Sequence, residues 1–344
     1  MKQNLLLHVG VHKTATTTIQ AALSRDRDAL RRDSILYPSC WPPFPREIVR
    51  PTKAHHRFAH AVAGTNWRGR AGASLFSRGL ARRAHHADRV VLSSEAMFRH
   101  RWRDTSYPDP REAYLVRVRG FLGAFDVTPL IYLRQPHRFA ESLFKEKAIK
   151  VGISQPSFAN FVQGNAALFD FHAYLLTLER VFGKYRLRIY DDEAKTGILR
   201  GFYREIGARI SPSSPDTRNR VSISNRALMW LVSNAAGSDE AVPIRLARRI
   251  YAALDPDSVF KEDHRTTLWP DRDSVESFAD RFRATFRISG LADLDSPREP
   301  AVIWTPDMDR RAEERFSRWC DANRLLIAGY RFRNPNSVLL EALG

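Results

Sequence analysis

The chain has 344 residues and carries 55 Lys and Arg against 38 Asp and Glu, which gives a formal net charge of +17 at pH 7. Its hydrophobic fraction of 43% and its seven Trp are enough for a folded core, which excludes wholesale disorder. Two cysteines, Cys40 and Cys320, exclude a disulfide framework and a cysteine-rich zinc site. At about 150 residues per domain, the length predicts two domains, or one large α/β domain with an extension.

The sequence also bears on membranes and compartment. No apolar run reaches the roughly 18 residues that cross a bilayer, so we expect no transmembrane segment. The stretch LLLHVGVH at 5–12 leads into Lys13 and threonines without a small-residue cleavage site, which favours a buried strand over a signal peptide. We therefore predict a cytoplasmic protein. The positive charge predicts an anionic partner, but it does not choose among nucleic acid, membrane, nucleotide and acidic polysaccharide.

Short apolar runs predict a parallel sheet that is covered on both faces. The runs are Asn4–Val9, Arg89–Ser93, Pro129–Leu133 and Leu187–Tyr190. Stretches with helical spacing lie between or beside them, at Thr16–Leu30, Arg138–Lys150 and Phe171–Phe182. Strands that alternate with helices predict an α/β fold with a P-loop-like parallel sheet flanked by helices.

Other segments set the predicted organisation. Five prolines in Pro38–Pro51 predict an irregular loop. Arg68–Arg83 is rich in Arg, Gly and Ala, and fits either a solvated helix or a flexible segment. The turn-rich Ser211–Pro215 marks a joint. We therefore expect an α/β core over 1–215 and a mostly helical C-terminal extension over 216–344.

The strongest local motif is LLLHVGVHKTATTTIQ, Leu5–Gln20. It predicts a buried strand, a tight loop and the start of a helix, which together place backbone N–H groups, hydroxyls and an ammonium around one point. Such a site suits an anion, and phosphate best. The candidate binding residues are Gly10, His12, Lys13, Thr14, Ala15, Thr16, Thr17 and Thr18. The loop is not a Walker A motif, because Lys13 follows Gly10 by three positions with no second glycine.

A second motif is IYLRQPHRFAESLFKEK, Ile131–Lys147. We expect its strand to deliver Arg134 to the carboxyl end of the sheet, and the helix that begins at Pro136 to carry Ser142. Ligands of open α/β sheets bind beyond the carboxyl ends of the strands. Two separate phosphate sites along one edge would suit a nucleotide that is phosphorylated at two positions.

Together, HVGxHKTxTTxIQ and YLRxxxxxxxxS resemble the sulfotransferases that use 3′-phosphoadenosine 5′-phosphosulfate (PAPS), especially bacterial enzymes that act on carbohydrates. Supporting stretches are VVLSSEAMF at 90–98, IYDDEAKTGILRGFYREIG at 189–207 and NRVSISNRAL at 219–228. The resemblance implies that the first loop holds the 5′-phosphosulfate, and that Arg134 and Ser142 hold the 3′-phosphate. Ala15 stands where the family more often has glycine, and an alanine fits there if its φ is negative.

The resemblance also implies roles for single residues and for partners. Lys13 would contact the bridging and 5′-phosphate oxygens, the threonines would donate to the same phosphate, and Arg220 would close over the 3′-phosphate. The product would be 3′-phosphoadenosine 5′-phosphate (PAP), and no metal is expected. We expect a saccharide hydroxyl, or an amine, as the acceptor, with the C-terminal helices completing its cleft.

An acceptor hydroxyl needs a general base within hydrogen-bond reach. Three residues are candidates, and the sequence does not choose among them. Glu95 ends VVLSSE at the ligand-bearing edge, while His56 and His55 follow the proline-rich loop. The neighbouring acidic pair, Asp191 and Asp192, is interpreted as a loop cap.

Two other functions compete with this interpretation. A P-loop-type ATP-dependent kinase of small molecules is disfavoured by the missing GK[ST] sequence. A nucleic-acid-binding protein would fit the charge, but the chain has no zinc pattern, no RNA-binding aromatic signature and no basic helix with heptads. We therefore expect no specific nucleic-acid partner.

Overall fold

The computed structural model describes residues 2–11, 14–40, 53–64, 67–101, 104, 106–107, 109–151, 158–213, 268–269, 272–281 and five single positions between 310 and 322, without the side chains of 147–151, 272 and 279. The chain divides into two units. The first comprises 1–135 and 171–220, and the second comprises 136–170 and 221–344.

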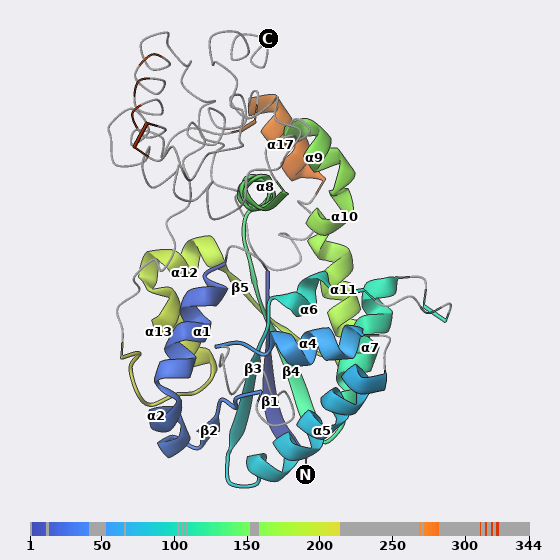
Figure 1. The fold of residues 1–344 in the computed structure, drawn as a ribbon, viewed down its shortest axis with the longest axis vertical. Helices are drawn as coiled ribbons and strands as arrows, with labels where there is room; N and C mark the ends of the chain where they lie inside the picture. The colour runs from blue at the N-terminus through green and yellow to red at the C-terminus, as the bar shows by residue number, and fades with distance from the viewer. Residues whose placement is uncertain are drawn as a thin grey trace. The chain divides into compact units, whose positions relative to one another are not determined.

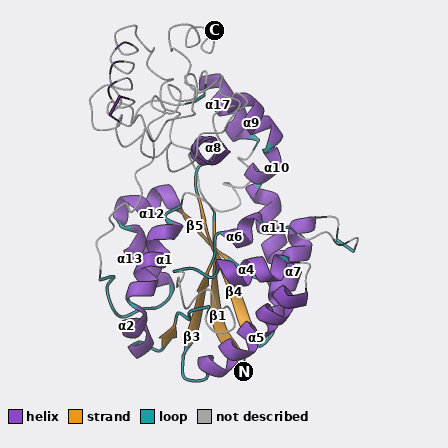
Figure 2. Cartoon of the chain, in the orientation of Figure 1, coloured by secondary structure: helices purple, strands orange, loops and turns teal. Residues whose placement is uncertain are grey.

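A five-stranded sheet forms the centre of the first unit (Figure 2). Its strands are β1 Gln3–Gly10, β2 Ile35–Leu36, β3 Arg89–Ser93, β4 Phe125–Leu133 and β5 Arg186–Ile189. They lie in the order β2-β3-β1-β4-β5, and every neighbouring pair is parallel. The predicted parallel α/β fold is therefore confirmed. The two-residue β2 was missed because so short a strand shows no periodicity.

Helices cover both faces of this sheet (Figure 1). One face carries α1 Thr16–Arg25, α2 Arg27–Arg32, α12 Tyr190–Thr196 and α13 Ile198–Glu205. The other carries α4 His56–Ala63, α5 Trp67–Ala84, α6 Ala96–Arg99, α7 Pro110–Phe121 and α11 Phe171–Phe182. Since both faces are covered, the central strands are buried on both sides, which explains their continuous apolar runs.

The α1 side of the sheet holds a buried apolar cluster. Ile19 and Leu23 of α1 pack with Leu6 of β1, Tyr132 of β4 and Phe202 of α13. These side chains are nearly inaccessible to solvent. The cluster fixes the start of α1 against the central strands, which is where the phosphate-site residues were predicted.

The structure corrects one predicted helix and decides between the two alternatives for another segment. The helix predicted over 16–30 is divided at Asp26 into α1 and α2. The segment Arg68–Arg83 lies within α5, where Ala73, Phe76 and Leu80 are buried. The helical alternative is thus the correct one.

The second unit contains α8 Pro136–Val151, α9 Phe158–Gly164, α10 Ala166–Phe169 and α17 Arg272–Asp280. Its core is aromatic, with ring contacts that link Phe144, Phe158, Phe161, Phe169, Trp269 and Phe278. The helix predicted over 138–150 is confirmed within α8. Most of the predicted extension over 216–344 lies outside the described residues. Among the helices that are described, none is both long enough and apolar enough to cross a bilayer.

Candidate functional site

The candidate site lies at the carboxyl ends of β1, β3 and β4. The chain runs from β1 to β2 and β3 on one side of it, and then to β4 on the other. This reversal of strand order is the switch point at which open α/β sheets bind ligands. Ser94, Glu95 and Arg134 follow their strands at this edge, and the turn after Gly10 opens onto it.

The turn from β1 into α1 is tight. A Cβ atom at Gly10 would lie 2.2 Å from Cγ2 of Thr16, so only glycine fits there without a rearrangement. Among the described residues no side chain caps α1, and its first turn carries no acidic residue. The N–H groups of the first turn, with the positive end of the helix dipole, therefore favour an anion.

Ala15 precedes α1 with φ 55° and ψ 20°, in the left-handed region. The negative φ that would suit an alanine is therefore not found. For a residue with a Cβ atom this conformation costs roughly 1–2 kcal/mol, because Cβ approaches the following carbonyl. The turn thus contains local strain at a position where glycine would be unstrained.

The threonines of this segment have different surroundings. The hydroxyl of Thr14 donates to the carbonyl of Val11 at 2.6 Å and so closes the loop. The hydroxyl of Thr16 donates to Oε2 of Glu95 at 2.7 Å, which joins the start of α1 to the end of β3. Thr17 is exposed and Thr18 is half-buried. These two lie on the first turn of α1, where a bound anion could reach them.

The three candidate bases are not equivalent. His55 is buried, its Nδ1 accepts from the N–H of Ser93 at 3.0 Å, and its Nε2 lies 2.8 Å from the carbonyl of Pro38. Burial lowers the pKa of His55 to about 4. With both ring nitrogens bonded to the backbone, His55 has a structural role here, and this arrangement argues against it as the base.

His56 remains a candidate together with Glu95. Nδ1 of His56 lies 2.9 Å from Oγ of Ser94. Partial burial lowers the pKa of His56, and the charge of Glu95 opposes that shift. His56 is therefore neutral near pH 7 and able to accept a proton, beside a carboxylate that is already oriented by Thr16.

A buried polar group behind the site was not among the predicted residues. His8 is completely buried on β1, and its Nδ1 lies 2.9 Å from Oγ of Ser93. Gln20 of α1 donates to the same Oγ at 3.1 Å. Burial lowers the pKa of His8 to about 3, so it is neutral. This group ties β1, β3 and α1 together, and a histidine within an apolar run was its sequence signal.

Arg134 lies directly after β4, as predicted, and is held by its neighbours. Its Nε is 3.7 Å from Oδ1 of Asp191, and its guanidinium carbon lies 5.5 Å from the ring centre of Tyr190. Oδ2 of Asp191 accepts the N–H of Gln135 at 3.1 Å, whereas Asp192 pairs with Lys195, and both lie in the first turn of α12 rather than in the predicted loop. Asp191 thereby holds the guanidinium of Arg134 close to the end of β4.

The remaining predicted residues are placed as follows. Ser142 is buried on α8, in the second unit. His12, Lys13 and Arg220 lie outside the described residues. Within the described part of the chain, no group of His, Cys, Asp and Glu side chains could hold a metal ion.

Comparisons with known proteins give similarities of structure alone. No family model and no curated protein matches the sequence. A crystal structure of a sulfotransferase from Alicyclobacillus acidocaldarius is similar to this structure, with a TM-score of 0.38 and 15% sequence identity. The similarity covers 64% of this chain and 87% of that chain.

Proposed function

We propose that this protein is a sulfotransferase that moves a sulfuryl group from PAPS to an acceptor hydroxyl on a saccharide. The observation that carries the proposal is the uncapped start of α1 at the switch point, where Thr16 is bonded to Glu95 and Arg134 follows the neighbouring strand. An anion site, a candidate base and a held arginine thus occur at one sheet edge. The motifs of the sequence add Lys13 and Ser142.

The described residues would have separate roles in binding the donor. PAPS, when bound, supplies the sulfuryl group. The first turn of α1 would hold the 5′-phosphate through its N–H groups and the hydroxyls of Thr17 and Thr18. Arg134 would bind the 3′-phosphate, and a guanidinium that is already oriented loses less freedom on binding.

The proton of the acceptor hydroxyl must leave as its oxygen bonds to sulfur. Glu95 and His56 are the two remaining candidates to accept that proton. Both lie at the edge of the sheet where β1 and β3 end. As in phosphoryl transfer, most of the catalysis would come from positioning and from stabilising charge on the leaving oxygens. In this proposal the ammonium group of Lys13 stabilises that negative charge.

A direct test is thermal unfolding of the whole chain with PAP, with ATP and Mg²⁺, or with duplex DNA. A ligand at 100 times its Kd stabilises the protein by about 2.7 kcal/mol, which gives a clear rise in Tm. We expect the rise with PAP. A rise with ATP and Mg²⁺ but none with PAP would favour a kinase, and a rise with DNA alone would favour nucleic-acid binding.

Arg134→Ala tests how the two phosphates are assigned. We expect PAP binding to weaken by about tenfold or more, since a hydrogen bond to a charged group contributes about 1.5–3 kcal/mol. Adenosine 5′-phosphosulfate lacks the 3′-phosphate, so its affinity should change little. Arg200→Ala, on the exposed side of α13, is the matched control. Equal losses for the two nucleotides would contradict the assignment.

A further inference from the structure

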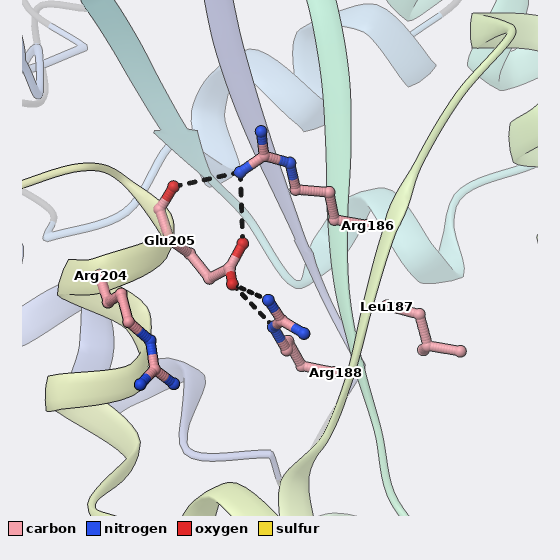
Figure 3. Close-up of a pocket in the computed structure, with 5 residues that line it drawn as sticks. All are labelled: Arg186, Leu187, Arg188, Arg204 and Glu205. Atoms are coloured by element: carbon pink, nitrogen blue, oxygen red, sulfur yellow. Dashed lines mark hydrogen bonds and ion pairs between the residues drawn. The ribbon is translucent and has the colours of Figure 1, made fainter. Parts of the chain in front are cut away.

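A groove of about 380 Å³ lies along β5 (Figure 3). It is lined by Arg186, Leu187, Arg188, Arg204 and Glu205. The first three residues belong to β5 and the last two to the end of α13. None of them is used in the proposed reaction.

The strand period explains how two of the arginines meet. Arg186 pairs in register with Leu130, and Arg188 with Tyr132. Paired residues of neighbouring strands share a face, so both guanidinium groups lie on the α13 side of the sheet. The last turn of α13 then brings Glu205 to them.

Glu205 organises the groove. Its side chain is buried, and its carboxylate accepts from Nη1 of Arg186 at 3.3 Å and from Nε of Arg188 at 2.8 Å (Figure 3). Nη2 of Arg188 bonds to the same carboxylate. Since a buried carboxylate is costly unless it is paired, these bonds hold both arginines in fixed positions.

The groove keeps an excess of positive charge after this pairing. Arg204 is exposed, and its guanidinium forms no hydrogen bond or ion pair with any described residue. Nε and Nη2 of Arg186 and Nη1 of Arg188 also lack an acceptor within the described part of the chain. The groove is therefore lined by three guanidinium groups and one carboxylate, and each guanidinium keeps unused donors.

The surroundings add to this balance. Arg89 donates to the carbonyl of Glu205 at 3.2 Å, and Glu193 lies 3.9 Å from Arg188. With these two residues included, the groove and its surroundings contain four arginines and two glutamates, an excess of two positive charges. Behind the groove, the hydroxyl of Tyr132 is buried and has no partner among the described residues. Burial raises the pKa of Tyr132, so this hydroxyl remains a donor.

We propose that this groove binds a tetrahedral oxyanion, a sulfate or phosphate group, either free or carried on a sugar. Guanidinium groups bind such anions through paired N–H donors, and here the unused donors come from three separate arginines. The volume lies within the range of small-ligand pockets and leaves room for a sugar beside the anion. The proposal rests on these residues alone and does not depend on the donor assignment.

The test is an NMR titration of the arginine Nε–H resonances of the full chain with inorganic sulfate, glucose 6-sulfate and glucose. We expect the first two to bind and glucose not to bind. Arg204→Gln should weaken binding by about tenfold or more, as expected for the loss of a charge-assisted contact. Arg204→Lys keeps the positive charge but loses the paired N–H donors of the guanidinium. Its affinity should lie between those of the parent protein and Arg204→Gln.

Two control variants separate this groove from other anion sites. Arg119→Gln and Arg180→Gln each remove an exposed arginine, on α7 and α11, that neither lines the groove nor belongs to the proposed donor site. Both should bind the probes within about twofold of the parent protein, because α7 and α11 lie across the sheet from the groove. Loss of the sulfate-induced shifts of the Arg186 and Arg188 resonances in Arg204→Gln, with their retention in both control variants, assigns the ion to this groove.

The outcomes that overturn the proposal are equally definite. They are unchanged affinity in Arg204→Gln, loss of binding in a control variant instead, equal binding of glucose, or no binding by the parent protein. If glucose 6-sulfate binds more tightly than the free ion, the natural ligand carries its oxyanion on a sugar. If only the free ion binds, the groove accepts inorganic sulfate or phosphate. Circular dichroism of each variant checks that the fold is kept.

Discussion

Ala15 shows how a single residue can combine local strain with a place in a binding loop. It adopts the left-handed conformation immediately before α1, where the first N–H groups of the helix are uncapped. Backbone strain tends to occur at functional sites, where the surrounding structure enforces it. Here the enforcing contacts include the close approach of Gly10 and Thr16 and the bond from Thr14 to Val11.

We predict that Ala15→Gly stabilises the protein. Relief of the left-handed strain gives roughly 1–2 kcal/mol, and the greater freedom of glycine in the unfolded chain takes back about 0.4–1 kcal/mol. The net gain should be on the order of 0.5–1 kcal/mol, measured by urea unfolding. Ala81→Gly, within α5, is the control and should destabilise by about 1 kcal/mol. A loss of stability in Ala15→Gly would contradict the strained conformation.

At the scale of elements, Asp26 explains why one predicted helix is two. It lies between α1 and α2, and its carboxylate accepts from the hydroxyl of Tyr203 at 2.6 Å and from the N–H of Ser213 at 3.1 Å. The hydroxyl of Ser213 donates to the same carboxylate. Asp26 thereby joins the end of α1 to α13 and to the segment that follows it.

We predict that Asp26→Asn destabilises the protein in a pH-dependent way. Burial alone would raise the pKa of Asp26, but the bonds from Ser213 and Tyr203 outweigh it, so its pKa is lowered. A lowered pKa contributes stability above the unfolded value of about 3.9, and this contribution disappears as the pH falls through the folded value. Urea unfolding should show a loss of about 1.5–3 kcal/mol at pH 7.

The difference between parent and variant should shrink as the pH falls from 7 toward 3, because the unfolded parent, whose pKa for Asp26 is higher, takes up a proton before the folded parent does. Asp28→Asn, at an exposed position on α2, is the control and should cost only about 0.3–1 kcal/mol through the helix dipole. A loss in Asp26→Asn that stays constant over this pH range would show that its charge is not what joins the helices.

The contacts of Asp26 and Arg134 show which features the sequence could predict and which it could not. β1, β3, β4 and β5 follow from apolar runs, and Gly10 and Arg134 follow from where those strands end. The break at Asp26 depends on Tyr203, 177 positions away, and the orientation of Arg134 depends on Asp191. Local patterns carry no information about such partners. For this reason His55 could be identified as a candidate, but its two bonds to the backbone could not be foreseen.

For the molecule as a whole, the net charge of +17 exceeds what the proposed donor would use. Much of it lies outside the candidate site. Helix α5 carries Arg68, Arg70, Arg78, Arg82 and Arg83 without any acidic residue, and Trp67 on the same helix is 68% exposed. Arginine beside an exposed aromatic ring suits sugars that bear acidic groups. This distribution favours an anionic saccharide, larger than one sugar unit, as the acceptor.

We therefore predict that the KM for an acidic polysaccharide acceptor rises steeply with salt, while the Kd for PAP rises much less. Attraction between exposed charges is screened beyond about 8 Å at physiological ionic strength, whereas a phosphate held by the first turn of α1 would be bound through short hydrogen bonds, which salt screens less. Initial rates at several salt concentrations, with PAP binding measured in parallel, separate the two effects. A KM that stays flat with salt, or a small apolar alcohol as the best acceptor, would contradict the acidic acceptor and leave the donor assignment standing.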